Sequence, residues 1–416
     1  MTGDGPAAGA ASFPGAAPRR GPSTLASARG VRHTPPVEPV TLPVDRVPPP
    51  ARHRYDHQPR LVFWETTKAC PLACVHCRAV AQPAPAPGEL TTDEGIRLID
   101  ELGAGPPPHP VLVLTGGDCL MRSDLLQLAA RARAAGVPVA IAPAVSPRLS
   151  DDVLASLRSL GVRHLSISLD GATAATHEGV RQVPGHFAAT LDAISRASAL
   201  GFQVQVNTAV MRANVEELAD VAVLLRRLGV RIWEVFFLVT VGRGTDVREI
   251  SPGETEDVCH FLVDVAQRGF VVRTVEGPFF RRVQTERASA ADTAGSPPGS
   301  LLAHLRSALA WGLGPPVQPV VAPSFGTRDG KGVIFVAHNG DVFPSGFLPL
   351  PLGNVRNGGL LDLYRDHPLL RSIRAGELSG RCGTCEHTDL CGGSRARAFA
   401  ATGDPLSEDP ACALVS

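Results

Sequence analysis

The sequence predicts an α/β fold: a partial (β/α)6 barrel, similar to a TIM barrel, followed by a small cysteine-rich domain. Three observations lead to this expectation. Short apolar runs alternate with helical patterns from Leu61 to about Thr274. Three cysteines lie directly after the first apolar run, and four more gather near the C-terminal end.

The barrel strands are predicted where short apolar runs are bounded by polar residues and glycines. In chain order, they are Leu61–Thr67, Val111–Thr115, Val137–Ala142, His164–Leu169, Gln203–Val210, Ile232–Val239 and Phe270–Thr274. Strands that alternate with helices form a parallel sheet with right-handed crossovers. Six or so units, rather than eight, predict an open partial barrel. In barrels of this type the chemistry lies at the carboxyl ends of the strands.

The helices are predicted where apolar residues recur with a period near 3.6. Their ranges are Thr92–Leu102, Ser123–Ala135, Asp151–Leu160, Phe187–Leu200, Val215–Leu228 and Glu254–Gln267. The expected N-caps are Thr91 or Thr92, Ser150 and Asn214, and the expected C-terminal stops are Gly136, Gly161, Gly201 and Gly229. Small polar side chains satisfy free N–H groups at a helix start, and glycine adopts the left-handed conformation that ends a helix.

Composition divides the chain into four parts. We expect a disordered leader rich in Pro, Ala and Gly at 1–58, the barrel at 59–283, a linker at 284–300 and a second domain at 301–416. The second domain contains a predicted hairpin, Gly332–Ala337 with Asp341–Phe343, because Asn339-Gly340 is a strong turn signal. A helix is expected near Leu360–Arg374.

Charge and hydropathy exclude several classes of partner. Lys plus Arg and Asp plus Glu both number 40, and this balance argues against a nucleic-acid partner held by its phosphates. No apolar run approaches the length of a membrane span, so no membrane partner is expected. The first residues carry no secretory signal. Grouped cysteines then favour metal ligation over disulfides, and the expected location is the reducing cytoplasm.

The most informative stretch is the loop with Cys70, Cys74 and Cys77. Three thiolates at spacings of four and three can hold three irons of a [4Fe–4S] cluster and leave the fourth iron open to a chelating molecule. Two other interpretations are a zinc site and isolated thiols. Zinc prefers four ligands and usually pairs two Cys-x-x-Cys units, so this spacing favours the cluster.

This loop after the first strand resembles the signature of radical S-adenosylmethionine (SAM) enzymes, and the resemblance extends from Leu61 to Cys412. It implies that the open iron binds SAM, and that one electron cleaves SAM to methionine and a 5′-deoxyadenosyl radical. It also implies a small-molecule or peptide substrate and an electron donor of the flavodoxin or ferredoxin type.

The resemblance implies SAM contacts at seven positions: His76, Gly116, Gly117, Asp118, Ser168, Arg181 and Asn207. Gly116-Gly117-Asp118 ends the second strand, where two glycines would let the backbone approach SAM and the carboxylate would hold its ammonium. Arg181 is suited to a carboxylate because its planar guanidinium binds in a bidentate way. Asp170 is a weaker candidate. A capped turn with an exposed arginine is the alternative interpretation of this region.

A second group of thiols consists of Cys382, Cys385, Cys391 and Cys412. Four ligands saturate either an auxiliary [4Fe–4S] cluster or a structural zinc ion, and spacing alone leaves both open. The tail resembles the SPASM or twitch extension of radical SAM enzymes, which implies an auxiliary cluster. Relatives continue the hairpin into Pro-Cys, whereas this chain has Pro344-Ser345, so we expect one auxiliary cluster and not two.

The cysteine-rich tail and Thr115–Asp124 resemble the branch that contains the alternative haem pathway decarboxylase and the haem d1 biosynthesis enzyme. The resemblance implies an oxidoreductase- or lyase-type enzyme that abstracts hydrogen from an organic substrate, with a tetrapyrrole carboxylate side chain as the favoured target. Arg395 and Arg397 would meet such carboxylates or form a basic face that is either solvated or supports the cluster. The alternatives are a maturase of a ribosomally made peptide and, in another class, a non-catalytic iron–sulfur or zinc protein.

Overall fold

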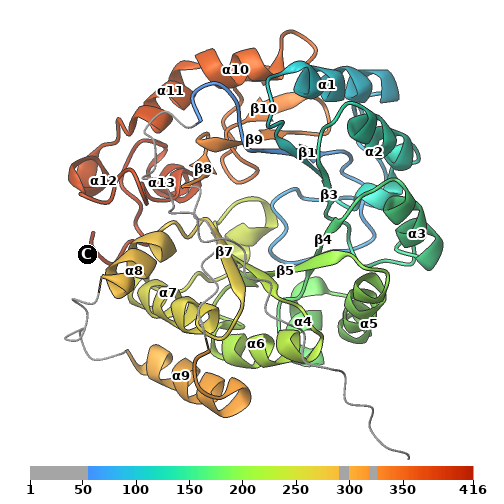
Figure 1. The fold of residues 1–416 in the computed structure, drawn as a ribbon. Coiled ribbons are helices and arrows are strands. Elements are labelled where there is room, and N and C mark those ends of the chain that lie inside the picture. The colour runs from blue at the N-terminus through green and yellow to red at the C-terminus, as the bar shows by residue number, and fades with distance from the viewer. Residues whose placement is uncertain (1–54, 290–298, 318–325, 416) are drawn as a thin grey trace, which may run out of the picture. The chain divides into compact units, whose positions relative to one another are not determined.

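The predicted strands form the centre of the fold in the computed structural model, which describes residues 55–289, 299–317 and 326–415. Seven strands run parallel in chain order (Figure 1). They are β1 (Leu61–Glu65), β2 (Val111–Thr115), β3 (Val139–Ile141), β4 (His164–Ser168), β5 (Gln203–Val210), β6 (Ile232–Phe237) and β7 (Val271–Val275). Each pairs in parallel with the next, so the predicted α/β partial barrel is confirmed.

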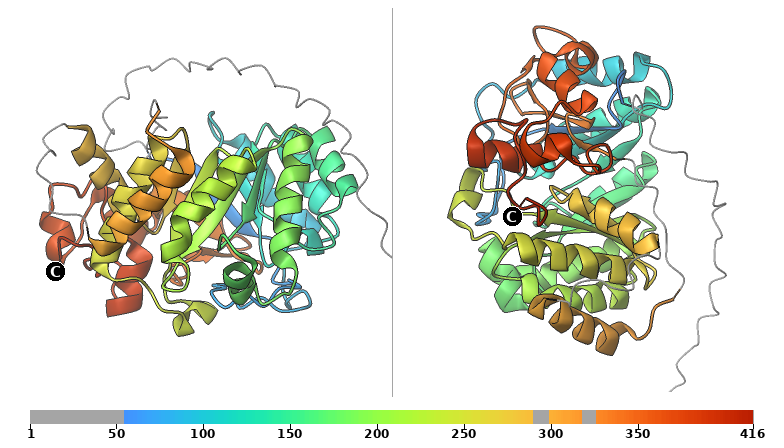
Figure 2. Two further views of the ribbon diagram at one scale, coloured as in Figure 1. Left: turned by 90° about the horizontal axis from the view of Figure 1, so that it is seen from below. Right: turned by 90° about the vertical axis from the view of Figure 1, so that its left-hand side faces the viewer.

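Helices cover the outer face of these strands (Figure 2). The helices of the barrel are α1 (Thr92–Ala104), α2 (Leu125–Ala134), α3 (Asp151–Ser159), α4 (Ala174–Arg181), α5 (His186–Ala199), α6 (Leu218–Arg227) and α7 (Pro252–Ala266), with short 3-10 turns η1 (Cys119–Met121), η2 (Val215–Glu217) and η3 (Gly242–Asp246). Along β5, residues with buried side chains alternate with half-buried ones. This period of two indicates that the outer side chains pack under the helices and the others face the barrel interior.

The helix ends follow the predicted signals except at Asn214, and one helix was not predicted. Thr91 and Ser150 cap α1 and α3, and the four glycine stops all have positive φ. Asn214, a predicted N-cap, makes no capping hydrogen bond. Its amide instead donates to the carbonyl oxygens of Asp170 and Ala209, which ties the loop after β4 to the end of β5. Helix α4 was not predicted, because its eight residues give too short a pattern.

The C-terminal hairpin extends the barrel sheet and is not the core of a separate layer. The remaining strands are β8 (Arg328–Asp329), β9 (Gly332–Val336), β10 (Asp341–Phe343) and β11 (Gly353–Asn354). Strand β9 pairs in parallel with β1, and the sheet order is β11-β10-β9-β1-β2 through to β7. The hairpin itself was predicted correctly. Its docking on the free edge of β1 is explained by the open barrel, which leaves that edge without a partner.

Three elements lie across the predicted domain boundaries. Helix α8 (Phe279–Ala288) includes the first residues of the predicted linker, whose residues 290–298 lie outside the described ones. Helix α9 (Ser300–Leu313), assigned to the second domain, packs on α6 and α7 of the barrel. The predicted leader overlaps the fold at its end, since Tyr55 is buried and its carbonyl oxygen accepts a hydrogen bond from Tyr364. Residues 1–54 lie outside the described residues.

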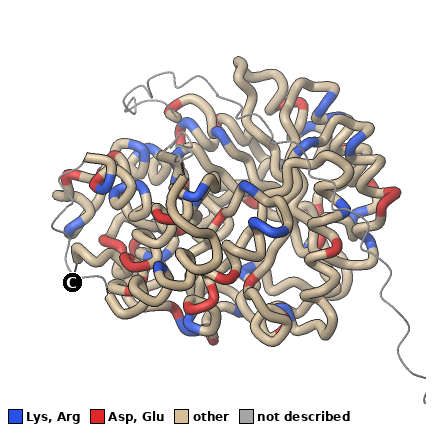
Figure 3. The backbone as a smooth tube through the Cα atoms, turned by 60° about the horizontal axis from the view of Figure 1, so that its bottom comes forward, with Lys and Arg blue, Asp and Glu red and all other residues tan. Residues whose placement is uncertain are grey.

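The last part of the chain folds into four short helices. They are α10 (Leu360–Asp366), α11 (Pro368–Ala375), α12 (Gly380–Thr384) and α13 (Arg395–Thr402). The single helix expected near 360–374 is divided because Pro368 starts a new one. Lys and Arg are interspersed with Asp and Glu over the described chain (Figure 3). None of its described helices is both long and apolar enough to cross a bilayer.

Candidate functional site

The loop that carries Cys70, Cys74 and Cys77 leaves the carboxyl end of β1 and lies beside α4 (Figures 1 and 2). The Val75 N–H donates to the carbonyl oxygen of Val180 in α4 at 3.0 Å. Both Cys70 and Cys74 are about 7% exposed, and Cys77 is half-buried. Burial raises the pKa of Cys70 to about 11. Thiolates here therefore need a nearby positive charge, which bound iron supplies.

Gly116 and Gly117 are required by the cysteine loop itself. A Cβ on Gly116 would lie 2.6 Å from the carbonyl oxygen of Thr67, and one on Gly117 would lie 2.4 Å from that of Ala69. The Gly117 N–H also donates to the Thr67 carbonyl at 2.8 Å. The end of β2 thus packs directly against the backbone that leads into Cys70, and any side chain would push this loop away.

Asp118 has a structural role that the sequence did not predict. Its side chain is fully buried and accepts hydrogen bonds from Leu120 N–H (3.1 Å), Ala144 N–H (3.3 Å) and the Ser146 hydroxyl (2.8 Å). Burial is the main cause of its raised pKa. Three protein donors hold this carboxylate in place, and its predicted contact with the ammonium of SAM stays a prediction.

Arg181 and Asp170 form a buried ion pair against the second cysteine. Arg181 Nη2 lies 2.6 Å from Asp170 Oδ2, and Nη1 lies 3.7 Å from Cys74 Sγ. Burial raises the pKa of Asp170, but Arg181 and His76 outweigh that effect, and the net shift is downward. The alternative of an exposed arginine is excluded, because the Arg181 side chain is 12% exposed.

Three polar atoms around this loop are buried without a hydrogen-bond partner among the described residues: His76 Nδ1, Arg181 Nε and Arg243 Nη2. Burying such atoms unsatisfied is costly, so their presence beside three thiols indicates room for a polar ligand. Burial lowers the pKa of His76 to about 4, which keeps its imidazole neutral at pH 7. These residues fit an iron–sulfur cluster whose open iron binds a polar molecule such as SAM.

Ser168 and Asn207 lie farther along the barrel interior. Ser168 ends β4 and is the register partner of Asn207 in the middle of β5, and both are half-buried. The Asn207 side-chain oxygen accepts a hydrogen bond from Gln205. Within the described residues neither side chain hydrogen-bonds to the cysteine loop. Their predicted contact with SAM stays a prediction.

Sequence reasoning missed two arginines at this site. Arg243 in η3 donates from Nε to the Cys74 carbonyl oxygen at 2.9 Å and from Nη1 to that of Ala81 at 3.3 Å. Arg78 follows Cys77, lies 4.3 Å over the Phe335 ring and pairs with Glu65 at 3.6 Å. The glycines around Arg243 were the available signal, since a Cβ on Gly242 would lie 2.4 Å from the Arg78 carbonyl oxygen.

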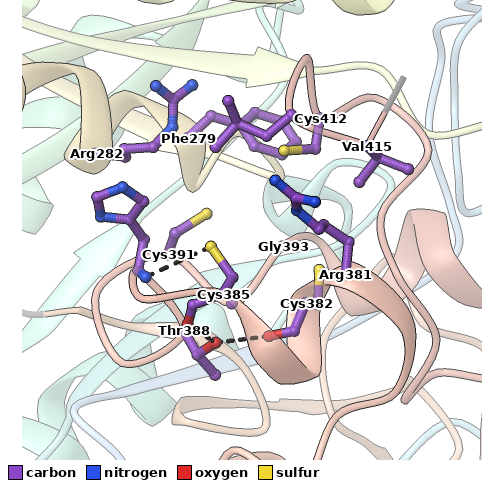
Figure 4. Close-up of a pocket in the computed structure, with 13 residues that line it drawn as sticks. Phe279, Arg282, Arg381, Cys382, Cys385, Thr388, Cys391, Gly393, Cys412 and Val415 are labelled. Carbon is purple, nitrogen blue, oxygen red and sulfur yellow. Dashed lines mark hydrogen bonds between the residues drawn. The ribbon is translucent and has the colours of Figure 1, made fainter.

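The four C-terminal thiols line one pocket (Figure 4). They come from α12, the loop before α13 and the last turn of the chain: Cys382, Cys385, Cys391 and Cys412. The Thr388 hydroxyl lies 2.6 Å from the carbonyl oxygens of both Cys382 and Cys385, and the His387 N–H donates to Cys385 Sγ at 3.4 Å. These bonds hold the loop between the second and third thiols in place.

Arg395 and Arg397 are buried at 0% and 4% exposure, which excludes them as surface contacts for a substrate carboxylate. Arg397 pairs with Asp409 and donates to the carbonyl oxygens of Glu276 and Leu238. Arg395 Nη2 lies 3.7 Å from Cys382 Sγ. Arg395 therefore agrees with the predicted support of the cysteine site, and Arg397 is held by Asp409 and two backbone carbonyl oxygens.

The cysteines have no preformed single-ion geometry. Among the described residues, no group of three or more His, Cys, Asp or Glu side chains is arranged as the ligands of one metal ion. A four-iron cluster spaces its thiolates farther apart than a single ion does. Side chains can still rearrange around a bound zinc ion, so the zinc alternative at the C-terminal site stays open.

Comparison with known proteins supports the sequence interpretation. Residues 64–225 match the Radical SAM superfamily. The chain is 36% identical to "AdoMet-dependent heme synthase" of Methanosarcina barkeri, over 85% of this chain and 96% of that protein. It is 30% identical to "Pre-heme d1 synthase" of Dinoroseobacter shibae, over 86% of each chain.

A solved structure shares the fold. The crystal structure of Streptococcus suis SuiB bound to precursor peptide SuiA has a TM-score of 0.62 and 14% identity, and covers 85% of this chain and 76% of that one. At this identity the likeness concerns the fold alone. The three-cysteine loop, its position after β1 and the full-length match to relatives agree, and the chain belongs to the radical SAM superfamily of enzymes.

Proposed function

We propose that this radical SAM enzyme abstracts a hydrogen atom from a carboxylate-bearing side chain of a tetrapyrrole. The observation that carries the proposal is the three-thiol loop surrounded by buried polar atoms without partners. A [4Fe–4S] cluster held there supplies the electron that cleaves SAM to methionine and the hydrogen-abstracting 5′-deoxyadenosyl radical. The relatives named for haem and pre-haem d1 synthesis support the choice of substrate.

The residues around the loop have separate tasks in this proposal. Cys70, Cys74 and Cys77 hold the cluster. Arg181 and Arg243 each keep one buried N–H group without a partner, which suits the carboxylate of SAM. Asp170 fixes the Arg181 guanidinium beside Cys74, so its orientation is set before any ligand arrives.

Arg78 adds a feature that suits a flat, conjugated substrate with carboxylates. Its guanidinium lies one residue beyond the third cysteine and over the rings of Phe335 and Phe347, at 4.3 and 5.9 Å. Phe347 also packs 6.2 Å from Phe236, whose side chain lies on the half-buried face of β6. Aromatic faces next to a cation can accept a macrocycle and its acid side chain.

We further propose that the four C-terminal thiols bind one auxiliary [4Fe–4S] cluster in a SPASM- or twitch-like extension. A flavodoxin- or ferredoxin-type donor would then reduce the enzyme in the cytoplasm. Grouped thiols in a reducing compartment support both expectations.

The test is anaerobic turnover of the reconstituted protein with dithionite. We expect 5′-deoxyadenosine from the intact chain and none when Cys70, Cys74 and Cys77 are all replaced by Ala, with a loss of about four irons. Cys259→Ala is the matched control, because it removes another buried thiol from helix α7. Product formation by the triple variant would contradict the assignment of this loop.

The substrate is tested by comparing iron tetrapyrroles that carry acetate and propionate side chains with precursor peptides. We expect a mass change in the tetrapyrrole coupled to 5′-deoxyadenosine, and no change in the peptides. A modified peptide with unchanged tetrapyrroles would replace the proposal with a peptide maturase, the second candidate.

A further inference from the structure

Three arginines around the C-terminal thiols lack a carboxylate partner. We call Arg281, Arg328 and Arg395 the arginine shell. Arg328 is only 7% exposed. Its Nη1 donates to the carbonyl oxygens of Thr388 (3.0 Å) and Cys391 (3.2 Å), and its Nη2 donates to that of Ile373 (3.3 Å). Among the described residues every hydrogen-bond partner of this guanidinium is a backbone carbonyl oxygen, and its buried Nε has none.

The other two members are held in the same way. Arg395 is fully buried, and its Nη1 donates to the carbonyl oxygens of Pro405 and Ser407, at 3.0 and 2.5 Å. Half-buried Arg281 donates from Nε to the Leu390 carbonyl oxygen at 2.7 Å, and its buried Nη2 has no partner. The shell thus surrounds the segment from Thr388 to Gly393 with cations that bind backbone carbonyl oxygens and, through Arg395, Cys382 Sγ.

Neighbouring arginines show that carboxylates are available in this region. Arg282, next in sequence to Arg281, pairs with Glu256 at 2.5 Å and with Glu286 at 2.8 Å. Arg397, two residues from Arg395, pairs with Asp409. Within the described residues no member of the arginine shell forms such a pair. A buried charge without a counter-charge is costly, so the missing anion must come from elsewhere.

Two glycines bring the shell close to the thiols. Gly392 and Gly393 follow Cys391 and adopt left-handed backbone angles, with φ of 64° and 63°. A Cβ on Gly392 would lie 2.3 Å from Arg328 Nη1, and one on Gly393 would lie 2.4 Å from Arg395 Nη2 and 3.2 Å from Cys382 Sγ. Side chains are absent here because the guanidinium groups occupy that space.

The charges also affect one another. Burial and then the cations Arg281 and Arg395 lower the pKa of Arg328 to about 10, against the opposing effects of Cys391 and Asp389. Arg328 therefore remains charged near pH 7. The three arginines are not among the residues that line the pocket, but Arg328 reaches the Cys391 carbonyl oxygen and Arg395 reaches Cys382 Sγ from outside it.

We propose that the arginine shell is the counter-charge of the group bound by the four C-terminal thiols and raises its reduction potential. The inference rests on the auxiliary cluster proposed above. A cluster held by four thiolates is negatively charged and gains a further negative charge on reduction. Buried cations stabilise the more negative state more strongly, so removing one makes the cluster harder to reduce.

The experiment is a redox titration of the reconstituted full-length enzyme, monitored by electron paramagnetic resonance. Excess SAM changes the signal of the open cluster and so separates it from the auxiliary one. Arg328→Gln keeps the hydrogen-bonding capacity and removes the charge. At a fixed ambient potential we expect at least a tenfold lower ratio of reduced to oxidised auxiliary cluster, a shift of about 59 mV for one electron.

Two further variants isolate charge from structure. Arg328→Lys keeps the charge and should retain a potential near that of the intact chain. Arg287→Gln is the control on the same helix as Arg281, because Arg287 pairs with Asp264 at 2.7 Å and is not part of the shell. It should leave the potential unchanged. Arg281→Gln, at a half-buried position, should shift the potential in the same direction as Arg328→Gln.

The possible outcomes are distinct. An unchanged potential in both Gln variants would overturn the inference and leave the auxiliary cluster standing. Zinc in place of iron at the C-terminal site would overturn the auxiliary cluster, and the inference with it. If Arg328→Gln loses only the auxiliary irons, recovery in Arg328→Lys supports the charge role. Loss in both would show that guanidinium shape, and not charge, is what the site needs.

Discussion

The Cys70–Cys77 loop and the C-terminal site both gather cysteine thiols, but the charged groups around the two sites differ. Near the first group, the cation Arg181 is neutralised by Asp170, and polar atoms are left without partners. Near the second, three arginines are left without carboxylates, and carbonyl groups take up most of their donors. The first site offers buried polar atoms to a polar ligand, and the second offers buried cations to an anion. This difference agrees with an open cluster at one site and a closed one at the other.

The largest effect should come from removing one thiol at each site. Cys74→Ser should abolish 5′-deoxyadenosine formation, because two remaining thiolates cannot hold a cluster with a single open iron. Cys412→Ser should leave SAM cleavage measurable while lowering iron content by up to four per chain. Product assay and iron analysis of the two variants separate the sites. Equal loss of SAM cleavage in both variants would contradict this division of roles.

The next largest effect concerns the ion pair beside the first site. Arg181→Gln leaves Asp170 as a buried carboxylate without its cation, which should destabilise the protein by about 3–5 kcal/mol. The double variant Asp170→Asn with Arg181→Gln removes both charges and should recover most of that stability. SAM binding should stay weak in the double variant, because the guanidinium is still missing. Chemical denaturation and SAM titration measure the two properties.

A recovery of SAM binding together with stability would show that Arg181 acts only on the fold. Asp100→Asn with Arg131→Gln is a suitable control, because it removes an exposed pair of the same residue types between α1 and α2. Such surface pairs contribute about 0–1 kcal/mol, so this control should match the parent protein in both measurements.

A smaller effect is expected from a single methyl group near the second site. Gly393→Ala meets a left-handed backbone and the Arg395 guanidinium at 2.4 Å, whereas Gly403→Ala meets only a left-handed backbone, with open space around its Cβ. The backbone cost is about 1–2 kcal/mol at both positions. Gly393→Ala should therefore unfold at the lower temperature and retain less auxiliary iron. An equal loss of thermal stability and iron in the two variants would show that the Arg395 side chain moves aside without an energetic cost.

The sequence predicted the seven barrel strands and the cysteine loop well, because both depend on local signals. Apolar runs identify β1 to β7, and the spacing of Cys70, Cys74 and Cys77 identifies the loop. The edge on which Gly332–Val336 docks was not predictable, because periodicity does not specify a strand's partner. Strand β9 pairs with the free edge of β1, which lies more than 200 residues earlier in the chain.

Charge pairing was not predictable for a similar reason. Arg281, Arg282 and Arg287 lie on one helix and look alike in the sequence. Only the fold determines that Arg282 and Arg287 meet carboxylates while Arg281 meets a carbonyl oxygen. Asp118 shows the converse case. A residue placed by motif at the cofactor is held by three donors from the loops after β2 and β3.

The last prediction concerns how folding stability near the first site depends on pH. Behind the Arg181–Asp170 pair, the Asp170 N–H donates to His177 Nδ1 at 3.1 Å, and His177 Nε2 lies 2.8 Å from His186 Nδ1. The His186 Nε2 atom lies 3.1 Å from the Val145 carbonyl oxygen. This row of hydrogen bonds requires that both imidazoles are neutral and carry their proton on Nε2. It links the loops after β3 and β4.

Burial lowers the pKa of His177 from 6.5 to about 3, so the unfolded chain takes up a proton on acidification before the folded one does. The contribution of the neutral His177 to the free energy of unfolding is therefore fully present above pH 6.5. It decreases as the pH drops toward 3, and about 2 kcal/mol of it is lost at pH 5. His177→Gln can accept from Asp170 N–H without titrating, and it should weaken the loss of stability between pH 7 and pH 5. Anaerobic thermal unfolding of both proteins at the two pH values measures this difference. An equal acid sensitivity in the variant would mean that groups other than His177 control it, and that the link behind Asp170 does not depend on a neutral imidazole.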